Sequence, residues 1–123
     1  MNLVDSSAWM EYFAGGKNAK HFAPIIQDLK NLVVSVINIY EVYKKISQHR
    51  DENSAIQAIA VMQQAEVLEI TSQIAIEGSK ISIQNKIPMA DSLIIASARS
   101  VGAKIWTQDY DFKGLDNVMF FKK

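Results

Sequence analysis

The sequence predicts an α/β fold built on a mostly parallel central sheet of four or five strands. Short apolar segments, rich in β-branched or aromatic residues and bounded by polar ones, are typical of buried parallel strands. They alternate with longer segments of helical periodicity, which favours a sheet covered by helices. The composition is globular, with 49% hydrophobic and 21% charged residues, and 123 residues suffice for one core. We therefore expect residues 1–123 to form a single domain.

Each element is expected from its own local pattern. In chain order they are strand 2–4, helices 7–13 and 19–29, strand 32–36, helices 38–49 and 52–65, strand 67–70, helices 72–86 and 90–101, and strands 104–107 and 118–121. Gly15 and Gly102 stop the first and last helices, and Pro88 lies just before the last helix begins. The two adjacent helices at 38–49 and 52–65 predict a helical hairpin between strands. The apolar stripe of the first consists of Ile39, Val42, Tyr43 and Ile46.

Charge and cysteine content exclude several classes of function. Thirteen basic residues balance thirteen acidic ones, so global basicity gives no argument for a nucleic-acid partner. The absence of cysteine excludes disulfides, zinc–thiolate sites and thiol nucleophiles. No segment has the pattern of a secretory signal, and the apolar runs are too short to span a bilayer. A cytoplasmic protein with no membrane partner is expected.

Four carboxylates recur at the ends or starts of apolar elements: Asp5, Glu41, Asp91 and Asp109. A carboxylate at the carboxyl end of a parallel strand points into the crevice where open α/β sheets bind ligands. If the four meet, each pair roughly 5 Å apart repels by about 3 kcal/mol at an effective dielectric of ~20. A bound cation or shared protons would make that arrangement tolerable. The pattern therefore indicates a candidate metal site.

Each carboxylate also has a purely structural interpretation. Asp5 could cap the helix that follows it, and Asp91 could be stabilised by the dipole at the start of its own helix. Glu41 lies well off the apolar stripe of its helix, as an ordinary solvated glutamate would. Asp109, followed two residues later by Asp111, could belong to a capped turn. Local sequence leaves these alternatives open.

The joint order of these residues closely resembles the PIN-domain ribonuclease family, and within it the VapC-type toxins of toxin–antitoxin pairs. The resemblance covers essentially the whole chain. The segments that carry it are Leu3-Val4-Asp5-Ser6-Ser7-Ala8-Trp9, Asn38-Ile39-Tyr40-Glu41-Val42, Met89-Ala90-Asp91-Ser92-Leu93-Ile94-Ile95-Ala96 and Thr107-Gln108-Asp109-Tyr110-Asp111-Phe112. One departure stands out. The family usually has a hydroxyl residue two or three positions before the glutamate, where this chain has Asn38 and Ile39.

The resemblance implies a three-layer α/β/α sandwich and a metal-dependent endoribonuclease. By position, Asp5, Glu41, Asp91 and Asp109 would be the catalytic, metal-binding acids. Asp111 would be an auxiliary acid, and Ser7 and Thr107 would orient Asp5 and Asp109. The implied cofactor is Mg²⁺, with Mn²⁺ also possible, and one ion or two would fit. The implied partners are an RNA substrate, a cognate antitoxin that covers the site, and a second copy of the chain in a homodimer.

The sequence also has alternative interpretations. A haloacid-dehalogenase-like phosphatase requires an aspartate at position 7, which is Ser7, and a response-regulator receiver requires paired acids where Leu3 and Val4 stand. The serious alternative is a PIN-like binding module that acts through a partner without catalysis. Neither His21 nor His49 falls in a motif, so no histidine base is assigned.

Basic and aromatic residues around such a site could contact RNA. The basic candidates are Lys44, Lys45, His49, Arg50, Lys86 and Lys113, and the aromatic ones are Trp9, Tyr12, Phe13, Tyr40 and Tyr43. For any single lysine a solvated helix face is the more ordinary explanation. Aromatic residues at helical spacing more often pack in a core or a subunit interface.

Overall fold

The computed structural model describes residues 1–123 and has an α/β architecture with five strands. The strands are β1 (Asn2–Val4), β2 (Leu32–Ser35), β3 (Glu66–Leu68), β4 (Lys104–Thr107) and β5 (Val118–Phe120). The helices are α1 (Ser6–Ala14), α2 (Ala19–Gln27), α3 (Val36–His49), α4 (Glu52–Met62), α5 (Ser72–Asn85) and α6 (Met89–Ser100). Two short 3₁₀ helices, η1 (Leu29–Asn31) and η2 (Tyr110–Phe112), complete the chain.

The five strands form one parallel sheet in the order β3-β2-β1-β4-β5. β1 lies at its centre, with Leu3 in register with Val33 of β2 on one side and with Ile105 of β4 on the other. The chain moves outward from β1 first through β2 and β3 and later through β4 and β5. The strand order therefore reverses between β1 and β4, and open α/β sheets bind ligands beyond the carboxyl ends of strands at such a switch point.

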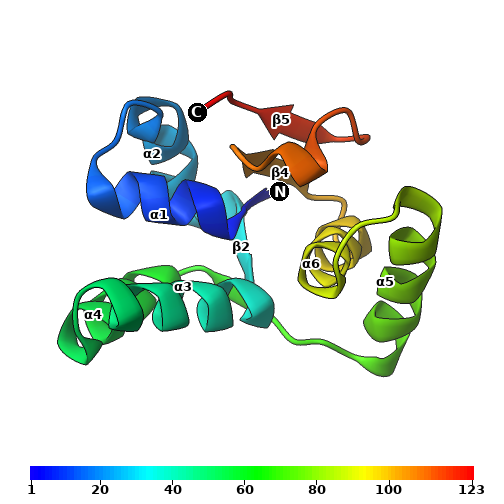
Figure 1. The fold of residues 1–123 in the computed structure, drawn as a ribbon, viewed down its shortest axis with the longest axis horizontal. Helices are drawn as coiled ribbons and strands as arrows, with labels where there is room; N and C mark the ends of the chain where they lie inside the picture. Colours follow the sequence, from blue (N-terminus) through cyan, green and yellow to red (C-terminus); the bar gives the residue numbers. More distant parts are fainter.

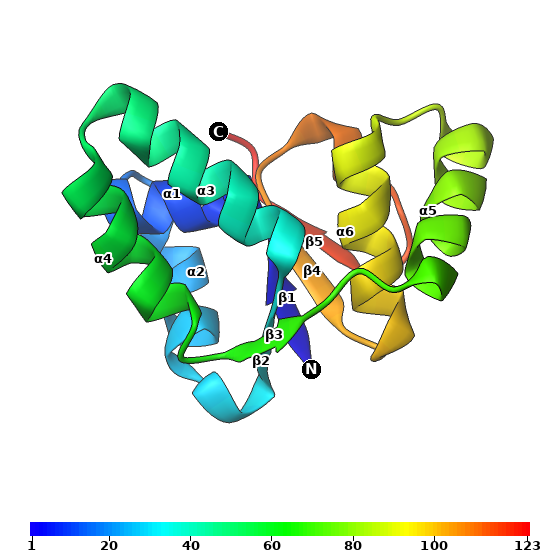
Figure 2. The same ribbon diagram turned by 90° about the horizontal axis from the view of Figure 1, so that it is seen from below.

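Helices cover both faces of the sheet, which confirms the three-layer α/β/α sandwich. In Figure 2, α1 to α4 lie on one side of the strands and α5 and α6 on the other. Successive strand residues alternate between the two cores. Val4 and Val34 pack in the core that includes Trp9, whereas Leu3 and Val33 pack in the core with α6. Two buried cores hold the central strands in place, and with them the loops at their carboxyl ends.

The elements differ from the sequence expectation mainly at their ends. The third helix begins at Val36 rather than at residue 38, because Ser35 ends β2 and caps the helix at once. Its Oγ accepts from the backbone N–H of Ile37 over 3.1 Å, while its own N–H donates to Oδ1 of Asn38 over 3.1 Å. This reciprocal pair is a capping box with asparagine in the position more often held by Glu or Gln. The turn η1 had no counterpart in the expectation: Leu29 was expected to end the second helix, and Lys30 and Asn31 were assigned to no element.

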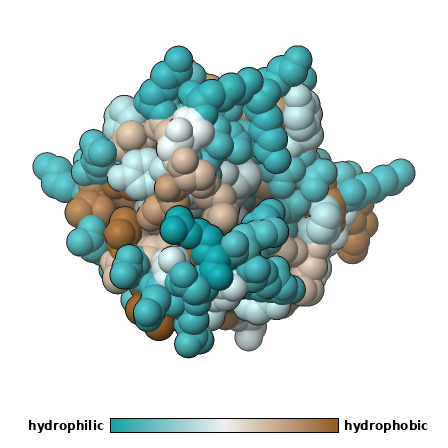
Figure 3. Space-filling model, turned by 60° about the vertical axis from the view of Figure 1, so that its left-hand side comes forward, coloured by the Kyte–Doolittle hydropathy of each residue, from teal (hydrophilic) through white to brown (hydrophobic).

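The helices pack against one another in pairs. α3 and α4 form the expected helical hairpin, and α5 lies beside α6 as Figure 1 shows. No helix combines the length and the apolar character needed to cross a membrane. Hydrophobic side chains also reach the surface, and Figure 3 shows hydrophobic atoms between hydrophilic ones on one face.

Candidate active site

Asp5 follows the central strand and is held by two hydroxyl groups. Its Oδ2 accepts from Ser7 Oγ over 2.8 Å and from Thr107 Oγ1 over 2.9 Å. The same oxygen accepts from the backbone N–H of Ser7 over 3.4 Å, so Asp5 also caps α1. The capping and site interpretations are thus compatible, because all three of these bonds engage Oδ2 and none of them engages Oδ1. The residue is 2% exposed and lines a pocket.

Thr107 connects the ends of the two central strands. We expected it to orient Asp109, and its hydroxyl instead donates to the carboxylate of Asp5. It also accepts the backbone N–H of Asp109 over 2.9 Å, so it fixes the main chain of that residue and not its carboxylate. Ser7 contacts Asp5 as expected. Both hydroxyls therefore donate hydrogen bonds to Asp5, and one of them, that of Thr107, comes from the end of the neighbouring strand β4.

Asp91, Asp109 and Asp111 form the tightest acidic cluster. Each offers one carboxylate oxygen, and these oxygens lie within 4.8 Å of one another. Asp91 projects from the first turn of α6, while Asp109 caps η2 by accepting the backbone N–H of Asp111 over 2.9 Å. Asp111, expected as an auxiliary acid, thus belongs to the same cluster as Asp91 and Asp109.

Burial and mutual repulsion oppose ionisation of the two most enclosed acids. The pKa of Asp5 is raised from 3.8 to about 6, first by burial and in small part by the charge of Asp109, against the lowering effect of its hydrogen bonds. The pKa of Asp91 is raised from 3.8 to about 8 by burial, by its hydrogen bond with Asp111, and by the negative charges of Asp109, Asp5 and Asp111. A bound cation would reverse both effects.

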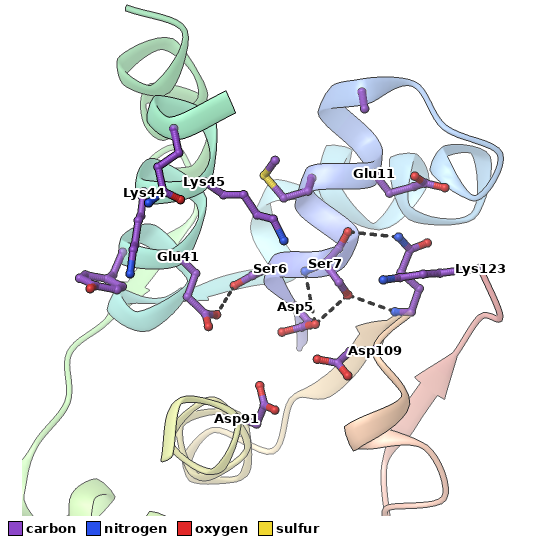
Figure 4. A pocket seen from close by; sticks show the side chains of 15 residues that line it. Asp5, Ser6, Ser7, Glu11, Glu41, Lys44, Lys45, Asp91, Asp109 and Lys123 are labelled. Carbon is purple, nitrogen blue, oxygen red and sulfur yellow. Dashed lines mark hydrogen bonds between the residues drawn. The ribbon is translucent and has the colours of Figure 1, made fainter. Parts of the chain in front are cut away.

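Glu41 joins the site from α3. Its carboxylate accepts from Ser6 Oγ over 2.7 Å, and Figure 4 shows it turned toward the other acids from the opposite side of the pocket. The expected apolar stripe predicted a solvated side chain here. In the structure the stripe is rotated, because its buried residues are Asn38, Val42 and Ile46. At about 100° per residue, Glu41 lies about 150° from the centre of the expected stripe and about 100° from that of the observed one.

The four predicted acids line one pocket of about 710 Å³ together with a basic wall. The lining residues are Asp5, Ser6, Ser7, Met10, Glu11, Ala14, Tyr40, Glu41, Lys44, Lys45, Gln48, Asp91, Gln108, Asp109 and Lys123. Lys44 and Lys45 were expected near the site, and Lys123 was not. Figure 4 shows Lys44 and Lys45 on the α3 side and Lys123 on the side of the C-terminal segment. None forms a salt bridge with an acid, since the one salt bridge of the structure joins Lys80 and Glu77.

The other basic and aromatic candidates lie elsewhere or have structural roles. His49, Arg50, Lys86 and Lys113 do not line this pocket, and both histidines are exposed. Trp9 is completely buried and stacks on Phe13 with ring centres 5.6 Å apart, so it belongs to the core. Among the aromatic candidates only Tyr40 lines the pocket, and it is 63% exposed.

The donor set fits a hard divalent cation. Every candidate ligand is a carboxylate oxygen, the type that Mg²⁺ and Mn²⁺ prefer. No basic side chain forms an ion pair with the cluster, and burial, followed by the charges of neighbouring acids, raises the pKa of Asp5 and of Asp91. Two further polar residues, Ser6 and Asn38, contact the site; neither was assigned a role from the sequence, although both lie in the segments that carry the resemblance. The capping box around Asn38 was the only local signal for either of them.

Comparison with known proteins identifies relatives across the whole chain. The family model described as PIN domain matches residues 3–118. No curated protein matches the sequence. Among solved structures, a toxin–antitoxin complex from Klebsiella pneumoniae is similar with a TM-score of 0.79 and 21% identity, covering 100% of both chains.

Two further solved structures have the same fold. The Mycobacterium tuberculosis toxin VapC20, described as cleaving the sarcin–ricin loop, has a TM-score of 0.80 and 18% identity over 96% of this chain and 97% of its own. FitAcB from Neisseria gonorrhoeae has a TM-score of 0.80 and 19% identity over 98% of this chain and 97% of its own. These likenesses establish a common fold.

Proposed function

The chain belongs to the PIN-domain family, and from that premise we propose that it is a metal-dependent endoribonuclease that hydrolyses RNA phosphodiester bonds. One observation carries the proposal: Asp5, Glu41, Asp91 and Asp109 come from four separate segments and line one pocket. Chance would rarely gather four uncompensated carboxylates, because their repulsion opposes folding. We treat residues 1–123 as a single PIN domain and these four residues as its catalytic, metal-binding acids.

The remaining polar residues have supporting roles in this proposal. Ser7 and Thr107 hold Asp5 through its Oδ2 at the wall of the pocket. Asp111 is an auxiliary acid, within 4.8 Å of Asp91 and Asp109 by its nearest ligand oxygen. The cofactor is Mg²⁺ or Mn²⁺, which when bound supplies activation of water and charge stabilisation at the leaving oxygen.

The basic wall of the pocket suits a polyanionic substrate. An RNA backbone that approaches four acids is repelled unless positive charge lies nearby. Lys44 and Lys45 line the pocket beside Glu41, and the Nζ atom of Lys44 lies 5.7 Å from the ring centre of Tyr40. In the proposed complex the lysines contact phosphates that flank the cleaved bond, and the exposed ring of Tyr40 is available to stack on a base.

The direct test compares the purified protein with Asp5→Asn on structured RNAs in Mg²⁺. We expect cleavage by the wild type, and at least 100-fold less by the variant (order of magnitude), because it removes a charged ligand while keeping shape. Asp28→Asn, an exposed position before β2, is the matched control and should cleave normally. Equal cleavage by Asp5→Asn and the wild type would contradict the proposal. RNA binding without cleavage by either would favour a PIN-like binding module.

We further infer that the protein is the toxin of a toxin–antitoxin pair, a cytoplasmic homodimer bound by a cognate antitoxin. Support comes from its likeness to a chain described as a toxin–antitoxin complex. The test is expression of the protein alone and together with the small open reading frame that neighbours its gene. We expect growth arrest that co-expression relieves. Normal growth in both cases would count against the toxin role without touching the nuclease activity measured on pure protein.

A further inference from the structure

A chain of hydrogen bonds leads from the buried side of α3 to the carboxylate of Glu41. Asn38 is completely buried, at 0% exposure, on the core-facing side of that helix. Its Nδ2 donates to Ser6 Oγ over 2.9 Å, and Ser6 Oγ donates to Glu41 Oε1 over 2.7 Å. The second of these bonds is drawn in Figure 4 at the edge of the pocket. Neither Asn38 nor Ser6 has a role among the acids and hydroxyls assigned above.

The backbone fixes the direction of these bonds. The N–H of Ser35 donates to Asn38 Oδ1 over 3.1 Å, and a backbone N–H can only donate. The amide of Asn38 must therefore turn its NH₂ group toward Ser6. Ser6 accepts that bond with its oxygen, so its single hydroxyl proton is directed at Glu41. The orientation of the hydroxyl is thus a consequence of the capping box at the start of α3.

Glu41 needs such support more than the other acids do. It lies on a half-buried side of its helix, and a glutamate there can adopt many rotamers, which it would lose on binding a cation. A hydrogen bond from a neutral hydroxyl to a carboxylate belongs to the stronger, charge-assisted class. Asn38 also marks the departure from the hydroxyl residue usual before the glutamate. Its amide accepts a hydrogen bond from Ser35 through Oδ1 and donates one to Ser6 through Nδ2. A serine or threonine at this position would have a single oxygen for both bonds.

We propose that Asn38 and Ser6 are positioning residues that hold the carboxylate of Glu41 in the pocket and thereby raise the affinity of the site for a divalent cation. The inference rests on the proposed function, since it takes Glu41 to participate in cation binding. It extends that function by assigning a polar network, buried at one end, to a single ligand. The network also explains why a buried asparagine replaces an apolar residue in the core-facing stripe of α3.

The test measures Mn²⁺ binding to the purified protein by titration calorimetry, without RNA. Ser6→Ala removes the hydroxyl. Asn38→Asp keeps the acceptor for the N–H of Ser35 but has no donor for Ser6, whose proton would then turn to the new carboxylate and away from Glu41. Each variant should weaken Mn²⁺ affinity by about 10-fold, as loss of an outer partner of a ligand typically does. The double variant should be no weaker than either single one, because both act through one bond.

The direction in which Asn38→Asp changes the Mn²⁺ affinity distinguishes a positioning role of Asn38 from a simple effect of charge. An added negative charge near the site would strengthen cation binding by simple electrostatics, so weaker binding is expected only if the network acts on Glu41. Asn53→Asp, an exposed position at the start of α4 that does not line the pocket, is the matched control and should bind Mn²⁺ normally. Ser6→Thr keeps the hydroxyl and should restore most of the affinity lost in Ser6→Ala.

The outcomes distinguish this inference from the proposed function. Unchanged or tighter Mn²⁺ binding by Ser6→Ala and Asn38→Asp, in a protein that cleaves RNA, would overturn the positioning role alone. A wild-type protein that binds no Mn²⁺ would overturn both. Should Asn38→Asp fail to fold because of the buried charge, the comparison of Ser6→Ala with Ser6→Thr decides the matter, since Ser6 is only half-buried.

Discussion

Asp5 and Asp91 couple the stability of the metal-free protein to pH. A carboxyl group whose pKa is higher in the folded chain than in the unfolded one binds its proton more tightly in the folded state. Its contribution to stability is complete below the ordinary value near 3.8 and is lost as pH rises through the folded value, about 6 for Asp5 and about 8 for Asp91. The apo protein should therefore become less stable from pH 4 toward pH 8.

We predict that urea unfolding in EDTA gives a lower free energy of unfolding at pH 8 than at pH 5. Only about one pH unit of the raised pKa of Asp5 lies above pH 5, so this residue accounts for about 1.4 kcal/mol of that loss. In Asp5→Asn the difference in the free energy of unfolding between pH 5 and pH 8 should be smaller by about the same amount. Mn²⁺ should restore stability at pH 8 and have less effect at pH 5, where protons already neutralise Asp5 and Asp91. A profile of Asp5→Asn as steep as that of the wild type would contradict the assignment.

Residue by residue, the sequence was most informative where a side chain follows a strand. Asp5 and Asp109 could be predicted to share a pocket because parallel strands bring their carboxyl ends together. Glu41 could not, since periodicity counts Asn38 as polar and so misplaces the buried side of α3. Thr107 was placed near the site, but its partner depends on the register of β1 and β4, which the sequence leaves open.

At the scale of elements, the close packing of α5 on α6 places Asp91. A Cβ atom added at Gly78 of α5 would lie 2.9 Å from Cδ2 of Leu93 and 3.6 Å from its Cα. Gly78 therefore permits a close approach of the two helices, which fixes the first turn of α6 relative to the sheet. In its absence the helices would have to separate or Leu93 would have to change rotamer.

Gly78→Val should destabilise the protein by about 2 kcal/mol, in the range usual for overpacking. Valine has a better helix propensity than glycine, so any loss comes from packing and not from the helix itself. Ala75→Val, at an exposed position of α5, is the matched control and should cost at most about 0.5 kcal/mol. Equal unfolding free energies for Gly78→Val and the wild type in urea titrations would show that the contact is not restrictive.

Element type and order could be predicted from sequence, whereas several boundaries could not. Periodicity and β-branched runs identify the strands and main helices because each element buries a repeating face. The start of α3 at Val36 depends on a side-chain cap, and η1 depends on a turn of three residues, which is too short to have a period. Pairing order among the strands likewise comes from tertiary packing.

For the whole molecule, a net charge of zero conceals a separation of charge within one pocket. Acids from four segments converge at one end, and Lys44, Lys45 and Lys123 line the same cavity without ion-pair partners. Composition alone gave no argument for an RNA partner, since the sum of the charges says nothing of their arrangement. The folded arrangement supports the proposed one, because a cation held by the acids would, together with the lysines beside it, present positive charge to a phosphate chain.

This arrangement predicts how salt affects RNA binding. In the cleavage-impaired Asp5→Asn background, the logarithm of the association constant should fall linearly with the logarithm of salt concentration. Replacing Lys44 and Lys45 by Gln should make the slope shallower by about 1.4, from roughly 0.7 per phosphate contact of a single strand. Lys30→Gln with Lys104→Gln removes the same charge near the amino ends of β2 and β4, on the edge of the sheet away from the pocket. That control pair should keep the original slope, because it lies outside the proposed RNA path. An equal change of slope in both pairs would show that RNA binding responds to the total charge of the protein and not to Lys44 and Lys45.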